Sequence, residues 1–444
     1  MNSSISHVTK MLFLLVILSL TLIGCQSAPD TATKAEAAEP TAEVSTGPVE
    51  LTFWTFLDPN ADDPRGKALN KIVTGFNESH PDIQVKVENI HWSKIDGQVI
   101  QATAAGAGPD LINIYSVQLA QHVGANTIQP MTDYVTAWLK EEGKDYIFPI
   151  ETVTYNNEVM ALPWEMRVWL LMYRKDLLEE AGLPVPQTLD QLAEVAGQLS
   201  TDQRTGLAIG FSEASLGADF VEKFEPLLWG AGGELLDDND EAAFTGAAGE
   251  KTMQWLYDAY HTDKAFGREA LSMTADDVLA GVKAGTVAMT IQGSMRVGAA
   301  RDSAETGDNL ATAPVPGWTE DAPLPALVAG QTLTIGKDTE HPDEAWEFIQ
   351  YYLNEESQLA FAEAGVMPVI SSAYDSPQLA ESPQAEEFKM WRDYAQAYGR
   401  MGHYPEDFPK LSEIMVKSAQ QIIFNDAPLT DTLSSAADQY NSIN

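Results

Sequence analysis

The stretch Val49-Glu50-Leu51-Thr52-Phe53-Trp54 alternates apolar with polar side chains and is rich in residues that favour β-strands. Residues 66–79 then carry apolar side chains at helical spacing, and residues 83–87 alternate again. A second helical segment at 95–105 is followed by an apolar strand at 111–115. Strands and helices that alternate in this way predict a parallel sheet with helices on its faces.

The carboxyl ends of these strands are where such a sheet is expected to bind a ligand. They place five candidate side chains in the first part of the chain: Trp54, Asp58, Tyr115, Ser116 and Gln118. Two of them have other plausible roles, since Trp54 is equally suited to the core and Asp58 to capping a turn before a proline.

A second α/β unit is predicted from residue 168 onward. Residues 168–173 and 286–291 have the composition of strands, and helical spacing recurs in three segments between them, 189–199, 249–261 and 276–284. Later, Pro342 stands where a first-turn proline belongs and opens another apolar-striped helix. The chain after residue 48 is too long for one core and long enough for two domains.

The N-terminus has the pattern of a bacterial export signal. Lys10 precedes an apolar run at 11–23, which is shorter than the roughly 20 residues that a spanning helix needs. Small residues then lead to Cys25, the chain's single cysteine, in a stretch that resembles the lipobox of bacterial lipoproteins. We therefore expect a signal peptide at 1–24, a lipid on Cys25, and a disordered tether of low hydrophobicity at 25–48.

The net charge of −39 limits the kinds of partner that the chain can attract electrostatically. So acidic a protein is a poor electrostatic match for nucleic acid or for an anionic membrane surface. It also disfavours highly anionic ligands without excluding them. Solubility is the simplest explanation of the charge, and an acidic run at 234–241 is expected to be a solvated loop.

The order of motifs resembles the family 1 extracellular solute-binding proteins of ABC importers, the class of the maltose-binding protein. Residues 104–110 read Ala-Ala-Gly-Ala-Gly-Pro-Asp, and residues 161–164 read Ala-Leu-Pro-Trp. Further pieces follow the same order along the chain: 51–54, 76–83, 172–183, 186–192, 230–233, 285–293, 313–317 and 345–349. Each piece alone is weak, but together, behind an export signal, they are specific.

The resemblance implies an α/β fold of the type II periplasmic-binding-protein kind, in which a hinge joins two lobes and the ligand cleft lies between them. On that template, lobe one is expected at 49–165 and 313–365, and lobe two at 166–312 and 366–444. The chain would cross between the lobes near 164–167, 312–316 and 366–368.

The same resemblance adds candidate ligand-binding residues at the crossings and in late loops: Trp164, Glu165, Arg167, Gly233, Met295, Arg296, Gln331, His403 and Tyr404. Trp164 is the leading candidate for stacking on a sugar. The chain departs from the family at Met295 and Arg296, where relatives often carry an aromatic residue, and this departure leaves the identity of the sugar open.

The implied function is capture of a mono- or oligosaccharide and its delivery to the permease subunits of an importer. An anionic solute such as glycerol phosphate or a uronate, with Arg167 and Arg296 as partners, is an alternative. We expect no catalytic residues, metal, cofactor or nucleic-acid partner, a membrane contact through the lipid only, and a monomer. A secreted glycoside hydrolase is the rival enzyme hypothesis, because paired carboxylates could serve it.

Overall fold

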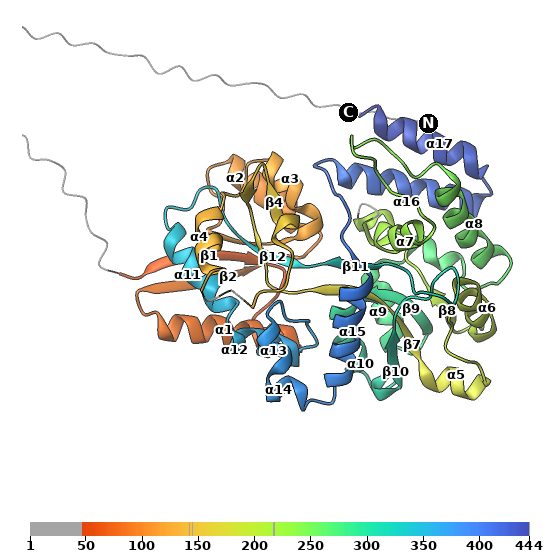
Figure 1. Cartoon of the computed structure of the whole chain (residues 1–444), viewed down its shortest axis with the longest axis horizontal. Coiled ribbons are helices and arrows are strands. Elements are labelled where there is room, and N and C mark those ends of the chain that lie inside the picture. Colours follow the sequence, from red (N-terminus) through yellow and green to blue (C-terminus); the bar gives the residue numbers. More distant parts are fainter. Residues whose placement is uncertain (1–46, 142, 144, 216–217, 444) are drawn as a thin grey trace, which may run out of the picture. The chain divides into compact units, whose positions relative to one another are not determined.

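The computed structural model describes residues 47–141, 143, 145–215 and 218–443, and these contain two β-sheets flanked by helices (Figure 1). The signal peptide, Cys25 and nearly all of the tether predicted from the sequence lie outside the described residues. The expected α/β class with two sheet-containing lobes is confirmed.

The first sheet has the strand order β2-β1-β3-β12-β6. The strand β1 (Val49–Thr55) pairs in parallel with β2 (Ile83–Asn89) and with β3 (Leu111–Tyr115). The strands β12 (Gln331–Ile335) and β6 (Leu162–Pro163) complete the sheet in antiparallel pairings. All three strands predicted from the N-terminal stretch are confirmed.

Helices cover both faces of this sheet, with α2 (Ile95–Ala104) above it and α1 (Pro64–Ser79) below it in Figure 1. The start of α1 is fixed by Asp63, whose carboxylate accepts the N–H groups of Arg65 and Gly66, and by a proline in the first turn. The apolar stripe of α1 is buried together with α11 (Pro342–Tyr352) and α12 (Glu355–Glu363).

The second sheet has the order β13-β11-β7-β9-β8, and β10 also pairs with β7. Its central strand β7 (Arg167–Arg174) and its neighbour β9 (Val287–Gly293) are almost wholly buried, as expected of strands covered on both faces. The other strands are β8 (Thr205–Ala208), β10 (Leu310–Ala313), β11 (Ala326–Ala329) and β13 (Gly399–Arg400).

The predicted helices of this part are confirmed as α6 (Leu189–Leu199), α8 (Ala247–His261) and α9 (Ala275–Lys283). Other helices are α3 (Leu119–Gly124), α4 (Thr132–Trp138), α5 (Lys175–Ala181), α7 (Ala218–Gly230), α10 (Val297–Arg301), α13 (Ser371–Asp375), α14 (Pro377–Ala380), α15 (Ala385–Tyr398), α16 (Phe408–Asn425) and α17 (Leu429–Asn441). A small hairpin joins β4 (Thr154–Tyr155) to β5 (Glu158–Val159). None of the helices within the described ranges is long and apolar enough to cross a membrane.

The second crossing between the sheets differs from the one expected near 312–316. The chain stays with the second sheet through β11, which pairs with β7, and enters the first sheet only after Gly330, as β12. The reason is the short, buried strand Ala326–Ala329, which has no clear signal in the sequence because Pro323 and Pro325 stand directly before it. The first crossing lies between β6 and β7, as expected, while the lobe boundaries as a whole stay a prediction.

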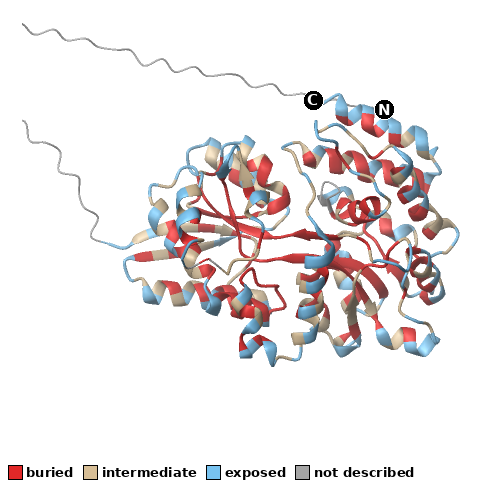
Figure 2. Ribbon diagram, viewed as in Figure 1, coloured by how far each residue is buried: buried red, intermediate tan, exposed pale blue. Residues whose placement is uncertain are grey.

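Buried side chains follow the strands of both sheets and the inward faces of the helices, while the outward helix faces are exposed (Figure 2). Two hydrophobic clusters account for this burial. The first contains residues of the first sheet, α1, α11 and α12, and extends over one face of the second sheet to α9 and α15. The second joins the other face of the second sheet to α6, α7, α8 and α16.

Close approach of the two crossings makes Gly330 a sensitive position. A β-carbon there would lie 2.2 Å from the carbonyl oxygen of Glu165 and 3.1 Å from the Phe148 ring. We therefore expect Gly330→Ala to lower the unfolding free energy by about 1–3 kcal/mol in urea titrations, because the backbone must move. Gly97→Ala is the matched control, since nothing lies within 4 Å of its β-carbon in α2. Equal stability of Gly330→Ala and the wild type would contradict the prediction.

Candidate functional site

The strand ends of the two sheets bring charged side chains to the place where the chain crosses between them. Glu165 lies between β6 and β7, and its side chain is fully buried. Nη2 of Arg65 donates to one carboxylate oxygen of Glu165 at 3.2 Å, and Nε of Arg167 donates to the other. Two guanidinium groups therefore share one carboxylate at the first crossing, and they supply the paired charge that a buried carboxylate needs.

Arg65 keeps unused hydrogen-bonding capacity in this cluster. Its side chain is only 18% exposed, and its Nε is buried without a hydrogen-bond partner in the described part of the chain. Burial lowers the pKa of Arg65, Glu165 opposes this shift, and the positive charges of Arg167 and Arg296 add to it. The guanidinium groups of Arg167 and Arg296 thus lie near enough to act on that of Arg65, in a chain of net charge −39.

Tyr115, at the end of β3, connects this cluster to the other lobe. Its ring centre lies 5.3 Å from the guanidinium carbon of Arg167, a cation–π distance. Its hydroxyl donates to Glu222 of α7 at 2.9 Å. Burial, followed by the charge of Glu222, raises the pKa of Tyr115 well above its ordinary value, so the phenol stays protonated and keeps donating.

The helix α7 contributes a second carboxyl group one turn further on. Glu225 is buried and accepts a hydrogen bond from the hydroxyl of Tyr404 at 2.7 Å. Burial raises the pKa of Glu225 to about 8, although the Tyr404 hydrogen bond acts in the opposite direction. The spacing of three residues puts Glu222 and Glu225 on one face of the helix, toward Tyr115 and Tyr404.

A third polar group joins the lobes at another point. The carboxylate of Asp276, in the first turn of α9, accepts from Nη1 of Arg296 at 2.9 Å and from the indole Nε1 of Trp92 at 3.1 Å. Arg296 follows β9 in the second sheet, whereas Trp92 follows β2 in the first. Burial is the largest influence on Asp276 and works against its ionisation, but the charge and hydrogen bond of Arg296, the hydrogen bond of Trp92 and the charge of His91 together lower its pKa.

Of the residues predicted from the sequence, five therefore lie in this interlobe network: Tyr115, Glu165, Arg167, Arg296 and Tyr404. Ser116 and Gln331 lie beside it at the second crossing, where the Ser116 hydroxyl accepts from the N–H of Gly330 at 3.2 Å. The side-chain oxygen of Gln118 is buried without a hydrogen-bond partner among the described residues. Contact of these residues with a solute stays a prediction.

The structure places Trp164 in the core instead. Its side chain is 0% exposed, and its ring lies 4.5 Å from that of Phe361 and 5.3 Å from that of Tyr352, between centres. No ring face is left for a sugar, so the stacking role expected for Trp164 does not hold. The crossing position that suggested the role is correct, but the backbone turns the indole inward.

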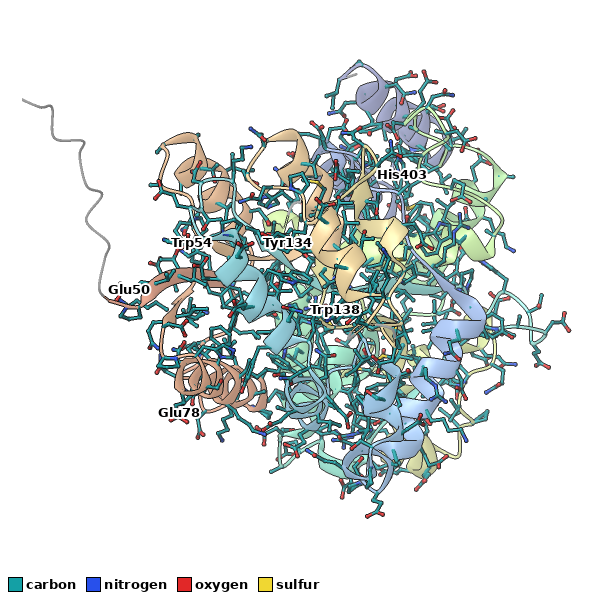
Figure 3. All side chains as sticks on the ribbon, turned by 60° about the vertical axis from the view of Figure 1, so that its left-hand side comes forward. Glu50, Trp54, Glu78, Tyr134, Trp138 and His403 are labelled. Atoms are coloured by element: carbon teal, nitrogen blue, oxygen red, sulfur yellow. The ribbon has the colours of Figure 1, made fainter. Side chains whose placement is uncertain are left out.

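Other predicted residues have structural partners away from the network. Asp58 accepts the N–H of Asn60 at 2.9 Å in a turn, and Trp54 packs half-buried on the first core. His403 is exposed and paired with Asp240, and Figure 3 shows it on a different part of the molecule from Trp54. Gly233 lies close to Leu228, and the side chain of Met295 lies close to Gly293.

Sequence reasoning missed five residues that the structure places in the network: Arg65, Trp92, Glu222, Glu225 and Asp276. Arg65 follows a recognisable helix start, Asp63-Pro64, so its position at the carboxyl end of β1 could have been found. Glu222 and Asp276 lie on helices of the other lobe, and their role depends on which face meets the first sheet. No local signal in the sequence carries that information.

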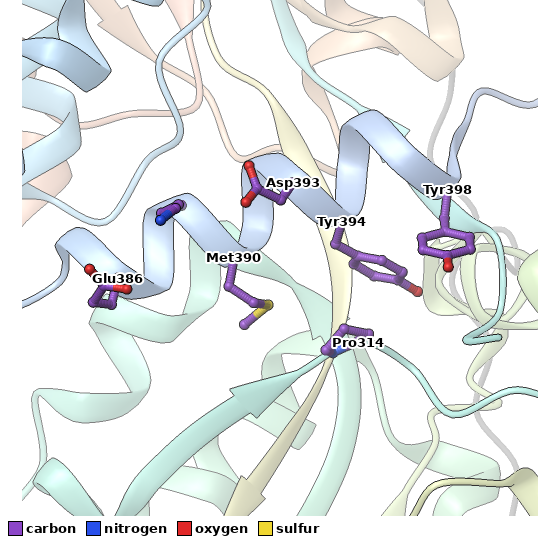
Figure 4. A pocket seen from close by; sticks show the side chains of 7 residues that line it. Pro314, Glu386, Met390, Asp393, Tyr394 and Tyr398 are labelled. Atoms are coloured by element: carbon purple, nitrogen blue, oxygen red, sulfur yellow. The ribbon is translucent and has the colours of Figure 1, made fainter. Parts of the chain in front are cut away.

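Two cavities lie away from this network. One of about 430 Å³ lies between α15 and Pro314 (Figure 4). Its lining combines Met390, Tyr394 and Tyr398 with the charged side chains of Glu386, Lys389 and Asp393. Another of about 720 Å³ lies where β8 and β9 begin, at the opposite end of these strands from Arg296. In the described ranges, no group of three or more His, Cys, Asp or Glu side chains is placed to hold a metal ion.

Comparison with known proteins identifies the family. The model of the bacterial extracellular solute-binding proteins matches residues 60–359, more than half of the chain. The chain belongs to this family. Similar proteins include an arabinooligosaccharide-binding protein of Halalkalibacterium halodurans, 22% identical over 69% of this chain and 67% of that protein. The sn-glycerol-3-phosphate-binding periplasmic protein UgpB of Pectobacterium atrosepticum is 23% identical over 74% of this chain and 75% of that protein.

Solved structures agree with the fold of this solute-binding protein. Maltose-bound MalE3 of T. maritima superposes with a TM-score of 0.77 at 20% identity, over 89% of this chain and 100% of that one. The GacH receptor of Streptomyces glaucescens superposes with a TM-score of 0.75 at 21% identity, over 89% of this chain and 98% of that one. The type II binding-protein fold expected from the sequence is thereby confirmed.

The buried carboxyl group of Glu225 predicts a pH dependence of stability. The pKa of Glu225 is about 8 in the folded protein and 4.5 ordinarily. Between these pH values Glu225 is therefore protonated in the folded state and ionised in the unfolded state. The contribution of Glu225 to the unfolding free energy therefore falls as pH rises through this range, by at most about 1.4 kcal/mol per pH unit. We expect Glu225→Gln to flatten this fall in urea titrations, while Glu180→Gln, at an exposed site, leaves it unchanged. An unaltered slope in Glu225→Gln would refute the assignment.

Proposed function

We propose that this protein captures a carbohydrate between its two lobes and delivers it to the permease subunits of an ABC importer. The observation that carries the proposal is the interlobe network, in which Arg–carboxylate pairs from both sheets lie beside aromatic rings. A sugar offers hydroxyl groups around its rim and apolar C–H faces, so it needs both kinds of partner. The family membership of the chain supports the receptor role.

The charge balance of the network favours a neutral solute. Each arginine near the crossing already faces a carboxylate, Arg65 and Arg167 at Glu165 and Arg296 at Asp276. Hydroxyl groups can add to such pairs as both donors and acceptors, and hydrogen bonds to charged groups are about twice as strong as neutral ones. Relatives described as binding arabinooligosaccharide or maltose support this choice.

An acidic solute is the second candidate, and a specific feature favours it. Arg65 and Arg167 share the single carboxylate of Glu165, and Nε of Arg65 has no partner in the described residues. A carboxylate or phosphate could occupy that excess of donors. The relatives described as sn-glycerol-3-phosphate-binding fit this alternative.

A thermal-shift panel separates the two candidates. It should contain maltose, arabinotriose, D-tagatose and ribitol as neutral solutes, and galacturonate and sn-glycerol 3-phosphate as acidic ones. Saturation at 100 times the dissociation constant adds about 2.7 kcal/mol of stability, enough to detect. We expect at least one neutral solute to raise the melting temperature and Arg167→Ala to abolish that shift. Shifts from acidic solutes alone would favour the second candidate, and no shift at all would contradict the receptor proposal.

We further propose that Cys25 carries a lipid that holds the receptor at the membrane after cleavage of the signal peptide 1–24. The segment 25–48 would then give the body freedom to reach a transporter. Cys25→Ala should move the protein from the membrane to the soluble fraction without changing its solute affinity, whereas Ser27→Ala should change neither. Retention of Cys25→Ala at the membrane after fractionation would argue against the anchor.

The absence of catalysis and the monomeric state are also part of the proposal. The family consists of solute-binding proteins, and the interlobe carboxylates are engaged by arginine, tyrosine or tryptophan donors. Release of nitrophenol from chromogenic glycosides would point to the hydrolase hypothesis instead. Light scattering of the purified protein tests the monomer.

A further inference from the structure

The tryptophans of this chain divide sharply by their packing. Of the ten tryptophans, all within the described residues, nine belong to or pack against one of the two hydrophobic cores. The exception is Trp92, which is half-buried and belongs to neither. A large apolar side chain that stabilises no core needs another explanation.

Trp92 is placed where a ligand would be met. It follows β2 at the carboxyl edge of the first sheet, the edge that also carries Tyr115. Across from it, β9 ends at Gly293, and the residues that follow, Ser294, Met295 and Arg296, bring no aromatic ring. Trp92 therefore supplies an indole from lobe one to a stretch of lobe two that lacks one.

The polar groups around the indole are incompletely satisfied. Both oxygens of Asp276 accept hydrogen bonds, one from Trp92 at 3.1 Å and one from Arg296 at 2.9 Å. Nε of Arg296, however, is buried and has no hydrogen-bond partner among the described residues. A buried donor without an acceptor is costly, and an oxygen atom of a bound solute would satisfy it.

We propose that Trp92, Asp276 and Arg296 form one wall of the solute site, with the indole of Trp92 as the plate on which a sugar ring stacks. This inference rests on the proposed carbohydrate function. Asp276 and Arg296 would bind hydroxyl groups on the rim of that ring. Asp276 is held for this purpose by the start of α9, where Thr274 and Asp277 cap the helix reciprocally.

A purely structural role makes a different prediction. If Trp92 served only to bridge the lobes, its contribution would come from the Nε1–H bond to Asp276 and would be lost equally in phenylalanine and alanine variants. If it serves as a plate, phenylalanine keeps an aromatic face while alanine removes it. The comparison of Trp92→Phe with Trp92→Ala therefore separates stacking from bridging.

The experiment is calorimetric titration of the full chain and its variants with every panel solute that stabilises the wild type. We expect Trp92→Ala to weaken binding by about tenfold or more and Trp92→Phe by no more than about threefold. Trp318→Ala is the matched control, because Trp318 is also half-buried but directs its indole N–H to the carbonyl of Leu227 in lobe two. Its affinity should be unchanged, and all variants should melt cooperatively without solute.

Each result has a definite meaning. If Trp92→Ala binds with wild-type affinity, the proposed wall of the solute site is wrong, while the receptor function stands. If both Trp92 variants lose affinity equally, the stacking role is wrong. If the wild type binds no neutral solute of the panel, the carbohydrate function itself fails, and the proposed wall fails with it. A much larger loss of affinity in Trp92→Ala than in Trp92→Phe supports the proposal.

Discussion

A fully buried carboxylate at the junction of two sheets is the constraint on which the interlobe architecture depends. Glu165 lies at the first crossing with no solvent exposure, so its charge must be balanced by protein groups. Arg65 reaches it from the start of α1 and Arg167 from the start of β7. The first sheet's leading helix, the crossing and the second sheet's central strand are thereby fixed to one another.

From that junction, hydrogen bonds extend between the lobes at two further points. Tyr115 of β3 donates to Glu222 of α7, and Trp92 after β2 donates to Asp276 of α9. In both cases a donor from the first sheet's carboxyl edge meets a carboxylate on a helix of the other lobe. A solute that binds here can shift the balance between lobe arrangements only by as much as it prefers one of them. The hydrogen bonds between the lobes contribute to the balance between lobe arrangements without a solute, and the preference of a solute adds to it.

The distribution of charge distinguishes the interlobe network from the rest of the chain. The chain has 65 acidic and 26 basic side chains, yet three arginines converge close to the interlobe network. Arginine suits this position because its planar guanidinium stays charged when buried and donates in several directions at once. On α7, by contrast, burial keeps Glu225 protonated over much of the neutral range. The network therefore combines fixed positive donors with carboxyl groups of different basicity, which is a chemistry suited to hydroxyl-rich solutes.

Local patterns in the sequence determined the strands β1, β2 and β3 and the helices between them, because alternation and helical spacing are short-range properties. The order of motifs was enough to predict the family and the fold. Tyr115 followed from its place at a strand end, and Glu165 and Arg167 followed from the crossing that the family resemblance implies. Only the tertiary structure decided the rest. It placed Trp164 in the core, kept β11 in the second sheet, and paired Tyr115 with Glu222 and Trp92 with Asp276 across the lobes. The physical reason is that these outcomes depend on which faces of distant elements meet, and a face is fixed by packing between lobes rather than by the residues next to it in the chain.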